Sequence, residues 1–220
     1  MSDQPYRAPV EPTPGSLPTS YWPGLEDREH SRWYTERFRA MAAQGDDLEG
    51  ESRLVDTLAP RGARLLDAGC GPGRHGGHLS RLGHRVVGVD IDPILVEAAR
   101  EDHPDATWLV GDLASLDLAA QGEDEPFDGV LVAGNVMDFI GEGHREEAVR
   151  RIAGHVRAGG FVLIGCRVGR GFTPAELDAA LPGTGLVLEQ RFATWDLRPF
   201  GPDSDFCVSV LRARGTGGRA

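Results

Sequence analysis

The chain has 220 residues, 40% of them hydrophobic and 26% charged, which is the composition of an ordinary globular domain with one sizeable core. Its formal net charge of −11 argues against a polyanionic partner such as nucleic acid, because phosphate backbones are bound by clustered cations. All 23 basic residues are arginine, which excludes mechanisms that need a lysine, such as Schiff-base chemistry or a Walker-type phosphate loop.

The pattern along the chain predicts one domain between two short terminal segments. Residues 1–24 are rich in proline and poor in aliphatic side chains, so we expect them to be disordered. The tail, residues 213–220, is rich in glycine and arginine, and we expect it to be flexible. The remaining stretch, residues 25–212, is long enough for one core and short for two domains.

Two helices are predicted at the start of this domain, over about residues 26–44 and 48–58. In the first of them Tyr34, Phe38 and Met41 share one face at helical spacing. Such a stripe is the usual packing surface of a helix, but the hydroxyl of Tyr34 can also reach a carboxylate in a binding site.

The most informative segment comes next, where an apolar run ends in a carboxylate and then in a glycine-rich turn. The sequence from Leu65 to Gly73 is L-L-D-A-G-C-G-P-G, and an amphipathic stretch follows it. This order predicts a strand, a tight turn and a helix. The glycines remove the Cβ atoms that would hold a ligand away from the backbone, and they permit positive φ. A turn of this kind is the usual nucleotide cradle of doubly wound α/β proteins.

Three further apolar runs also end in a carboxylate or an amide. They are residues 85–90, ending in Asp90, residues 106–112, ending in Asp112, and residues 127–135, ending in Asn135. Strands that alternate with helical segments predict a doubly wound, Rossmann-like α/β sheet, mostly parallel, with helices on both faces. The carboxyl ends of parallel strands meet at one edge, so these polar side chains should line a common site.

Start and stop signals place the later elements. Asp92-Pro93 predicts a helix N-cap followed by proline in the first turn, and Thr173 with Glu176 has the spacing of a capping box. Gly159-Gly160 should end a helix that carries Arg150 and Val156. A buried strand is expected over 161–165, and apolar runs over 186–188 and 206–211 predict two more.

This ordered set resembles the class I S-adenosylmethionine-dependent methyltransferases over roughly residues 25–212. It is most similar to small bacterial members, through the sequence motifs D-A-G-C-G-P-G-R at 67–74 and A-G-N-V-M at 133–137. The resemblance implies S-adenosylmethionine as the cofactor. It also implies an antiparallel hairpin that closes the sheet at its C-terminal edge, and N-terminal helices that cap the cofactor, so that Tyr34 would contact it.

The resemblance assigns roles to the carboxylates. Asp67 would lie near the methionine amino group, directly or through water, and Asp90 would accept hydrogen bonds from both ribose hydroxyls. Asp112 would hold the adenine amino group, with Ile91 and Leu113 on the two faces of the ring. Contacts are also implied for Ala68, Gly69, Cys70, Gly71 and Gly73 in the turn, and for Ala133, Gly134 and Asn135 after the fourth strand.

Two other interpretations stay open. The first is a nicotinamide-dependent oxidoreductase, whose glycine-rich turn would bind a pyrophosphate. The Asp67 carboxylate would repel that group. Its G-x-G-x-x-G fingerprint also needs glycine where this chain has Arg74. A methyltransferase-like module that binds the cofactor and regulates a partner without turnover keeps the same residues, since fold does not fix function.

Three residues are candidates for catalysis. Asn135, the only asparagine of the chain, should fall beside the sulfonium, although a strand-terminal turn residue is an equal alternative. His75 and Asp138 are candidates to take a proton from the acceptor, and Asp138 could equally cap a helix. His75 and His78 lie three residues apart without a third ligand in the pattern, so we expect no metal site.

The acceptor should bind at the same edge, within reach of residues 135–144, 167–172 and 195–200. These segments offer His144, Arg167, Trp195 and Arg198, where an arginine could pair with an anionic acceptor or lie on a solvated surface. The chain lacks the Asp/Asn-Pro-Pro-Tyr sequence and the Pro-Cys pair of methyltransferases that modify bases and glutamine. We therefore expect a small-molecule acceptor rather than nucleic acid.

The three cysteines, Cys70, Cys166 and Cys207, have neither C-x-x-C nor metal-ligand spacing. We expect reduced thiols in a cytoplasmic protein, with Cys166 and Cys207 as core residues. No apolar run approaches the length of a membrane span and no basic, then apolar, leader is visible, so no membrane association is expected.

Overall fold

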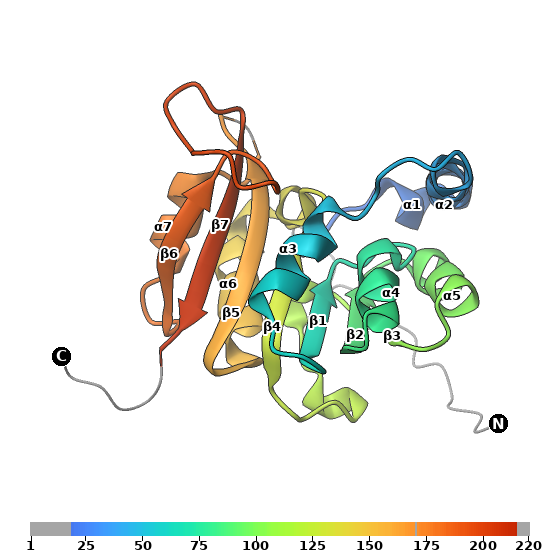
Figure 1. The fold of residues 1–220 in the computed structure, drawn as a ribbon, viewed down its shortest axis with the longest axis horizontal. Coiled ribbons are helices and arrows are strands. Elements are labelled where there is room, and N and C mark those ends of the chain that lie inside the picture. Colours follow the sequence, from blue (N-terminus) through green and yellow to red (C-terminus); the bar gives the residue numbers. More distant parts are fainter. Residues whose placement is uncertain (1–18, 170, 215–220) are drawn as a thin grey trace.

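The computed structural model describes residues 19–169 and 171–214, and these form one seven-stranded sheet with helices on both faces (Figure 1). The strand order is β3-β2-β1-β4-β5-β7-β6. The strands are β1 (Arg64–Ala68), β2 (Arg85–Asp90), β3 (Thr107–Val110), β4 (Phe127–Val132), β5 (Val156–Arg167), β6 (Leu186–Phe192) and β7 (Phe206–Ala213). β1 to β5 pair in parallel, and β7 runs antiparallel to both β5 and β6. The predicted fold class, with its antiparallel strand near the C-terminal edge, is confirmed.

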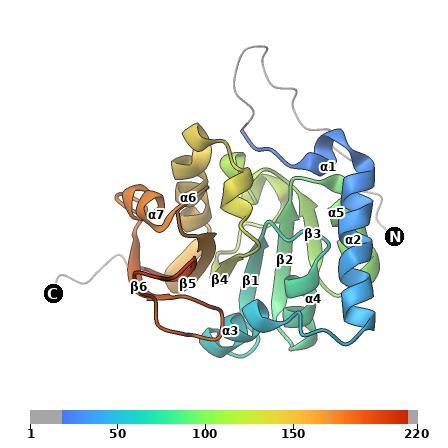
Figure 2. The same cartoon turned by 90° about the horizontal axis from the view of Figure 1, so that it is seen from above.

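The helices divide between the two faces of the sheet (Figure 2). One face carries α3 (Gly50–Leu58), α4 (Arg74–Arg81) and α5 (Pro93–Asp102), and the other carries α6 (Arg145–Gly154) and α7 (Pro174–Ala180). The helix α2 (Arg28–Ala43) lies outside the sheet against α5 (Figure 2). Short 3₁₀ turns are η1 (Leu113–Ser115), η2 (Ala119–Gln121), η3 (Val136–Phe139) and η4 (Glu142–His144).

The predicted helix starts are confirmed. The Asp92 carboxylate accepts a hydrogen bond from the Ile94 N–H at 2.8 Å, directly before α5. Thr173 and Glu176 form the expected capping box at α7. The predicted helix end at Gly159-Gly160 is wrong, because α6 already ends at Gly154 and β5 begins at Val156. The β-branched Val156 pairs with Phe127 in the sheet instead of extending the helix.

The N-terminal part of the chain differs most from expectation. Of the segment expected to be disordered, residues 1–18 lie outside the described residues, whereas residues 19–24 are ordered. Residues 19–22, here called the strap, run beside the turn that follows β4: the Tyr21 N–H donates to the Phe139 carbonyl at 2.6 Å, and the Gly141 N–H donates to the Thr19 carbonyl at 3.0 Å. Backbone pairing of this kind has no hydrophobic signature in the sequence.

The strap leads into α1 (Pro23–Glu26), a single turn that packs on α2. At the other end of the chain, Ala213 is still part of β7, and residues 215–220 of the predicted tail lie outside the described residues. Among the helices that the structure describes, none combines the length and the hydropathy that crossing a bilayer requires.

Candidate active site

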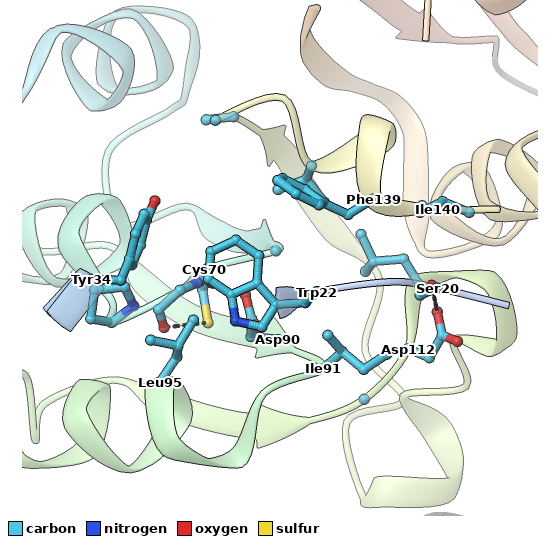
Figure 3. Close-up of a pocket in the computed structure, with 18 of the residues that line it drawn as sticks. Ser20, Trp22, Tyr34, Cys70, Asp90, Ile91, Leu95, Asp112, Phe139 and Ile140 are labelled. Atoms are coloured by element: carbon cyan, nitrogen blue, oxygen red, sulfur yellow. Dashed lines mark hydrogen bonds between the residues drawn. The ribbon is translucent and has the colours of Figure 1, made fainter. Parts of the chain in front are cut away.

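A pocket of about 830 Å³, counted with its open mouth, lies at the carboxyl ends of β1, β2, β3 and β4 (Figure 3). It lies where ligands bind in open α/β sheets. Of the residues predicted for the cofactor, ten line it: Tyr34, Gly69, Cys70, Gly71, Asp90, Ile91, Asp112, Leu113, Ala133 and Gly134; the catalytic candidate His75 lines it as well.

The glycine-rich turn after β1 is shaped by what surrounds it. Gly69 has φ +82°, and a Cβ there would lie 2.4 Å from the Val136 side chain, so only glycine fits. The Gly71 N–H donates to the Asp90 carboxylate at 2.8 Å, and the Gly76 N–H donates to the Asp67 carboxylate at 2.9 Å. Two amides of the turn region are thus already bound to carboxylates of the protein.

Asp67 and Asp90 differ in their position relative to the pocket. Asp90 lines it, whereas Asp67 is buried behind the turn and, like Ala68 and Gly73, is not among the described residues of the pocket wall. Burial raises the pKa of Asp67 to about 7 and that of Asp90 to about 6, against the opposing effect of the amides that they accept. Negative charge at these two positions is therefore costly without a cationic or hydrogen-bonding partner.

Asp112, at the far end of the pocket, is held by the strap. Its Oδ1 accepts hydrogen bonds from the Ser20 hydroxyl at 2.6 Å and the Ala114 N–H at 2.9 Å, and its Oδ2 accepts one from the Thr19 hydroxyl at 2.6 Å (Figure 3). Ser20 and Tyr21 are therefore part of the pocket wall, which the sequence did not indicate.

An aromatic cluster covers the centre of the pocket. The Trp22 indole lies edge-on to Tyr34 at 5.3 Å and to Phe139 at 5.2 Å between ring centroids, and Tyr34 meets Phe38 at 4.9 Å. The Trp22 Nε1–H donates to the Asp92 carboxylate at 2.9 Å, so the indole is fixed in place. Trp22 and Phe139 were missed because neither belongs to a periodic segment of the sequence.

His75 combines deep burial with unused hydrogen-bonding capacity. It lines the pocket, and both its ring nitrogens are buried without a hydrogen-bond partner in the described part of the chain. Its Nε2 lies 3.6 Å from the Glu51 carboxylate, too far for a hydrogen bond. Burial, with the neighbouring Arg74 guanidinium, holds the pKa of His75 well below its ordinary value. The imidazole is therefore neutral at pH 7 and can accept a proton.

Asn135 and Asp138 lie beside the described wall of the pocket rather than in it. Asn135 takes the left-handed conformation, with φ +57°, and begins η3, which matches the alternative of a turn residue. Asp138 accepts a hydrogen bond from the Phe172 N–H at 2.7 Å and thereby fixes the loop after β5.

The four residues expected to contact the acceptor also lie outside the described pocket wall: His144, Arg167, Trp195 and Arg198. β6 runs parallel to β5, so the turn after it is at the carboxyl edge, as the sequence analysis required. However, Trp195 packs on Phe206 and over Gly165. Arg198 pairs with Asp196 at 3.3 Å on an exposed surface.

Arg74 is the basic side chain in the described wall of the pocket, together with the neutral His75. Its guanidinium lies 5.0 Å from the centre of the Phe38 ring and donates to the Leu48 carbonyl at 2.6 Å. The sequence contained a signal for it, since Arg74 closes the D-A-G-C-G-P-G-R motif, but the motif by itself assigns the side chain no contact.

Comparison with known proteins identifies the class of this site. Residues 65–160 match the model of a family described as a methyltransferase domain. A crystal structure of a TehB-like SAM-dependent methyltransferase from Corynebacterium glutamicum is 44% identical, with a TM-score of 0.80, over 86% of this chain and 100% of that one. The chain therefore belongs to the class I S-adenosylmethionine-dependent methyltransferases.

Two curated relatives illustrate the breadth of the likeness. Hemagglutinin 1 from Eikenella corrodens is 30% identical over 75% of this chain, and a ubiquinone biosynthesis O-methyltransferase from Methylocella silvestris is 39% identical over 49% of it. The chain spans 52% and 42% of the length of these relatives. Other matched relatives are named as methyltransferases of an amino sugar, of 18S rRNA and of a ribosomal protein.

S-adenosylmethionine is the cofactor of this family, and the site fits it. The ligand carries a sulfonium and an ammonium but no phosphate. Asp90 and Asp112 present carboxylates to the pocket, and the turn amides that would bind a phosphate are engaged by Asp67 and Asp90. Arg74 adds a permanent positive charge to the described wall, of the kind that pairs with a carboxylate.

Proposed function

We propose that the protein transfers the methyl group of S-adenosylmethionine to a small-molecule acceptor. The observation that carries this proposal is the covering of the pocket by the strap and by the cluster of Trp22, Tyr34, Phe38 and Phe139. An aromatic cover over the pocket suits a small acceptor, and Arg74 alone adds a permanent positive charge to the described wall. A nucleic acid would need several cations around the mouth.

The proposed cofactor contacts follow the order of the strands. Asp90 would accept the ribose hydroxyls, since each of its oxygens has one backbone donor and keeps a free lone pair. Asp112 would accept the adenine amino group through Oδ2, which keeps one lone pair beside the Thr19 hydroxyl. Ile91 and Leu113 would flank the ring, and Arg74 would pair with the methionine carboxylate. Asp67 would act on the ligand by positioning the turn.

The cofactor, when bound, supplies a methyl group that is electrophilic because it is attached to a sulfonium. The protein's part is to align the acceptor and to exclude water, and the aromatic cluster serves both. Where the acceptor atom carries a proton, the neutral imidazole of His75 would receive it, since the residue is part of the pocket wall and its ring nitrogens have no hydrogen-bond partner in the described part of the chain. Asn135 and Asp138 would act only by holding the turn after β4, and we keep a cytoplasmic location as part of the proposal.

The test of cofactor binding is calorimetric titration with S-adenosylmethionine, S-adenosylhomocysteine and NAD. We expect the adenosyl ligands to bind with micromolar affinity to the wild type and to Glu146→Ala, an exposed acid on α6 that serves as the matched control. Asp90→Ala should lose at least about tenfold in affinity, equivalent to about 1.4 kcal/mol. Binding of NAD alone, or equal affinity in Asp90→Ala, would overturn the cofactor assignment.

The affinity for the adenosyl ligands should depend on pH through the ionisation of Asp90. Its carboxyl has a raised pKa of about 6, and its ionised form is the one that accepts both hydroxyls. Affinity should therefore be constant above about pH 7 and fall by at most about tenfold per pH unit below about pH 6. Affinity that rises on acidification would contradict this role.

Turnover is tested by screening small-molecule acceptors for production of S-adenosylhomocysteine. This also distinguishes an enzyme from a cofactor-binding module, which would bind and never turn over. For an acceptor that loses a proton, His75→Asn should keep cofactor affinity and lower kcat by about 10²- to 10⁴-fold. An unchanged kcat would remove His75 from the mechanism. Activity only on RNA or protein would refute the proposed acceptor class.

A further inference from the structure

Cys166 on β5 and Cys207 on β7 lie directly opposite each other in the antiparallel part of the sheet. The Val168 N–H donates to the Asp205 carbonyl two residues further along, at 2.9 Å. Because hydrogen-bonded and non-hydrogen-bonded pairs alternate in such a ladder, the two cysteines form a hydrogen-bonded pair, with Cα atoms about 5.5 Å apart. That separation is inside the range of Cα distances, about 4.4–6.8 Å, that disulfides span, and closing the bond requires the two Cβ atoms to move closer than they lie in a hydrogen-bonded pair.

The two thiols face the same side of the sheet and interact directly. Each thiol is the largest influence on the pKa of the other: the pairing lowers the pKa of Cys207 and raises that of Cys166. The Ser209 hydroxyl lies 3.6 Å from the Cys207 sulfur, where either atom can donate. The thiolate is the nucleophilic form of cysteine, so Cys207 is the more reactive member of the pair.

A polar group reaches this pair through an otherwise apolar core. Arg191, on the edge strand β6, donates from Nε to the Ser209 hydroxyl at 3.3 Å, and its positive charge lowers the pKa of both thiols. The other end of its guanidinium bonds Asp178 on α7 at 2.6 Å, at a half-exposed position. This chain of contacts links the buried pair to a half-exposed carboxylate at the edge of the sheet, where local opening of the edge strand would admit a small oxidant.

We propose that Cys166 and Cys207 form an oxidative modification site, at which a peroxide converts the two thiols into a disulfide that joins β5 to β7. The Cys207 thiolate attacks one peroxide oxygen, the O–O bond breaks, and the departing hydroxide takes a proton to leave as water. Cys166, after giving up its proton, attacks the sulfenic sulfur of Cys207; the S–S bond forms and the S–O bond breaks, releasing a second water. The thiols lose two electrons and hydrogen peroxide gains them.

The third cysteine provides an internal contrast. Cys70 lies in the cofactor turn, and burial raises the pKa of its thiol well above the ordinary value. In the structure it is a free thiol on another element, so oxidation there would add oxygen instead of closing an intramolecular bond. This inference does not depend on the proposed function, because neither Cys166 nor Cys207 lines the pocket in the described part of the chain.

The experiment treats the folded full-length protein with hydrogen peroxide, blocks remaining thiols with N-ethylmaleimide, and measures the mass before and after dithiothreitol. We expect a loss of two hydrogens that dithiothreitol reverses. The chain has no lysine and trypsin does not cut before proline, so digestion should give one cross-linked species made of residues 158–167 and 192–212.

The controls are single substitutions at the three cysteines. Cys70→Ala should still form the cross-linked species, whereas Cys166→Ala and Cys207→Ala should not. The wild-type peptide map decides the matter even if a core variant fails to fold. Oxygen addition without the cross-link, a cross-link that includes Cys70, or full labelling of Cys166 and Cys207 after peroxide would each overturn the proposal.

Discussion

Two buried carboxylates accept hydrogen bonds from the amides of the cofactor turn, and their burial lowers the stability of the ligand-free protein. Asp67 accepts from Gly76 and Asp90 from Gly71, yet burial raises the pKa of both. A carboxyl whose folded pKa is raised stabilises the fold in its protonated form, and that contribution is lost as the pH rises through the folded pKa. Ionised Asp67 and Asp90 therefore lower the free energy of unfolding near neutral pH.

Asp67→Asn should raise the free energy of unfolding of the ligand-free protein at about pH 8. The amide oxygen can still accept from Gly76, and the charge is gone. The change of pKa from 3.8 to about 7 sets an upper bound of about 4 kcal/mol. Urea denaturation from about pH 4 to about pH 8 should show the difference from wild type vanishing at the acid end. A difference that does not change with pH would contradict the explanation. Asp90 titrates in both proteins, and its charge is one cause of the raised pKa of Asp67, so the difference includes their mutual repulsion.

The polar residues that follow the strands show which parts of the site could be predicted from the sequence alone. Asp90 and Asp112 follow apolar strands, so the parallel sheet had to bring them to one edge. Asn135 and Asp138 follow a strand as well, but neither is part of the described pocket wall: Asn135 has φ +57° and begins a 3₁₀ turn, and Asp138 accepts a hydrogen bond from the Phe172 N–H. A side chain's direction in an irregular turn depends on tertiary contacts that no local pattern encodes.

At the scale of elements, the strands and the helix caps were predictable because each has a local physical cause. The strap was not, because its order comes from partners far along the chain. Thr19 and Ser20 bind Asp112, and Trp22 binds Asp92. In a proline-rich segment these residues look like an unfolded tail, yet here they join the loops after β2, β3 and β4.

Trp22→Ala should accelerate release of S-adenosylhomocysteine. The indole covers the pocket between Tyr34 and Phe139, so its loss should increase the dissociation rate by at least about tenfold, equivalent to about 1.4 kcal/mol. Displacement kinetics against excess unlabelled ligand measure this rate. Trp22→Phe keeps a ring but not the bond to Asp92, and should be intermediate.

The matched control for the strap is Leu25→Ala, which truncates an apolar side chain on α1 that is 44% exposed and absent from the pocket wall. Its dissociation rate should equal that of the wild type. If Trp22→Ala and Leu25→Ala release the ligand equally fast, the strap does not retain the cofactor.

At the scale of the whole molecule, the order of strands determines which loops can act on the ligand. β1 lies between β2 and β4, and β3 lies beyond β2, so the loops after these four strands surround the pocket. The hairpin of β6 and β7 occupies the far edge, beyond β5. That separation explains why Trp195 and Arg198 are at the correct end of the sheet and still outside the described pocket wall.

The net charge of −11 acts on the ligand over a longer range than these contacts. S-adenosylmethionine carries one net positive charge at neutral pH, whereas S-adenosylhomocysteine has none. Raising the salt from about 0.01 M to about 1 M shortens the screening length from about 30 Å to about 3 Å. The Kd of S-adenosylmethionine should rise several-fold over this range, while that of S-adenosylhomocysteine changes little, as calorimetry can measure. Because the two ligands differ only in the methyl group and its charge, an equal change for both would show that the acidic field of the protein does not contribute to cofactor selection.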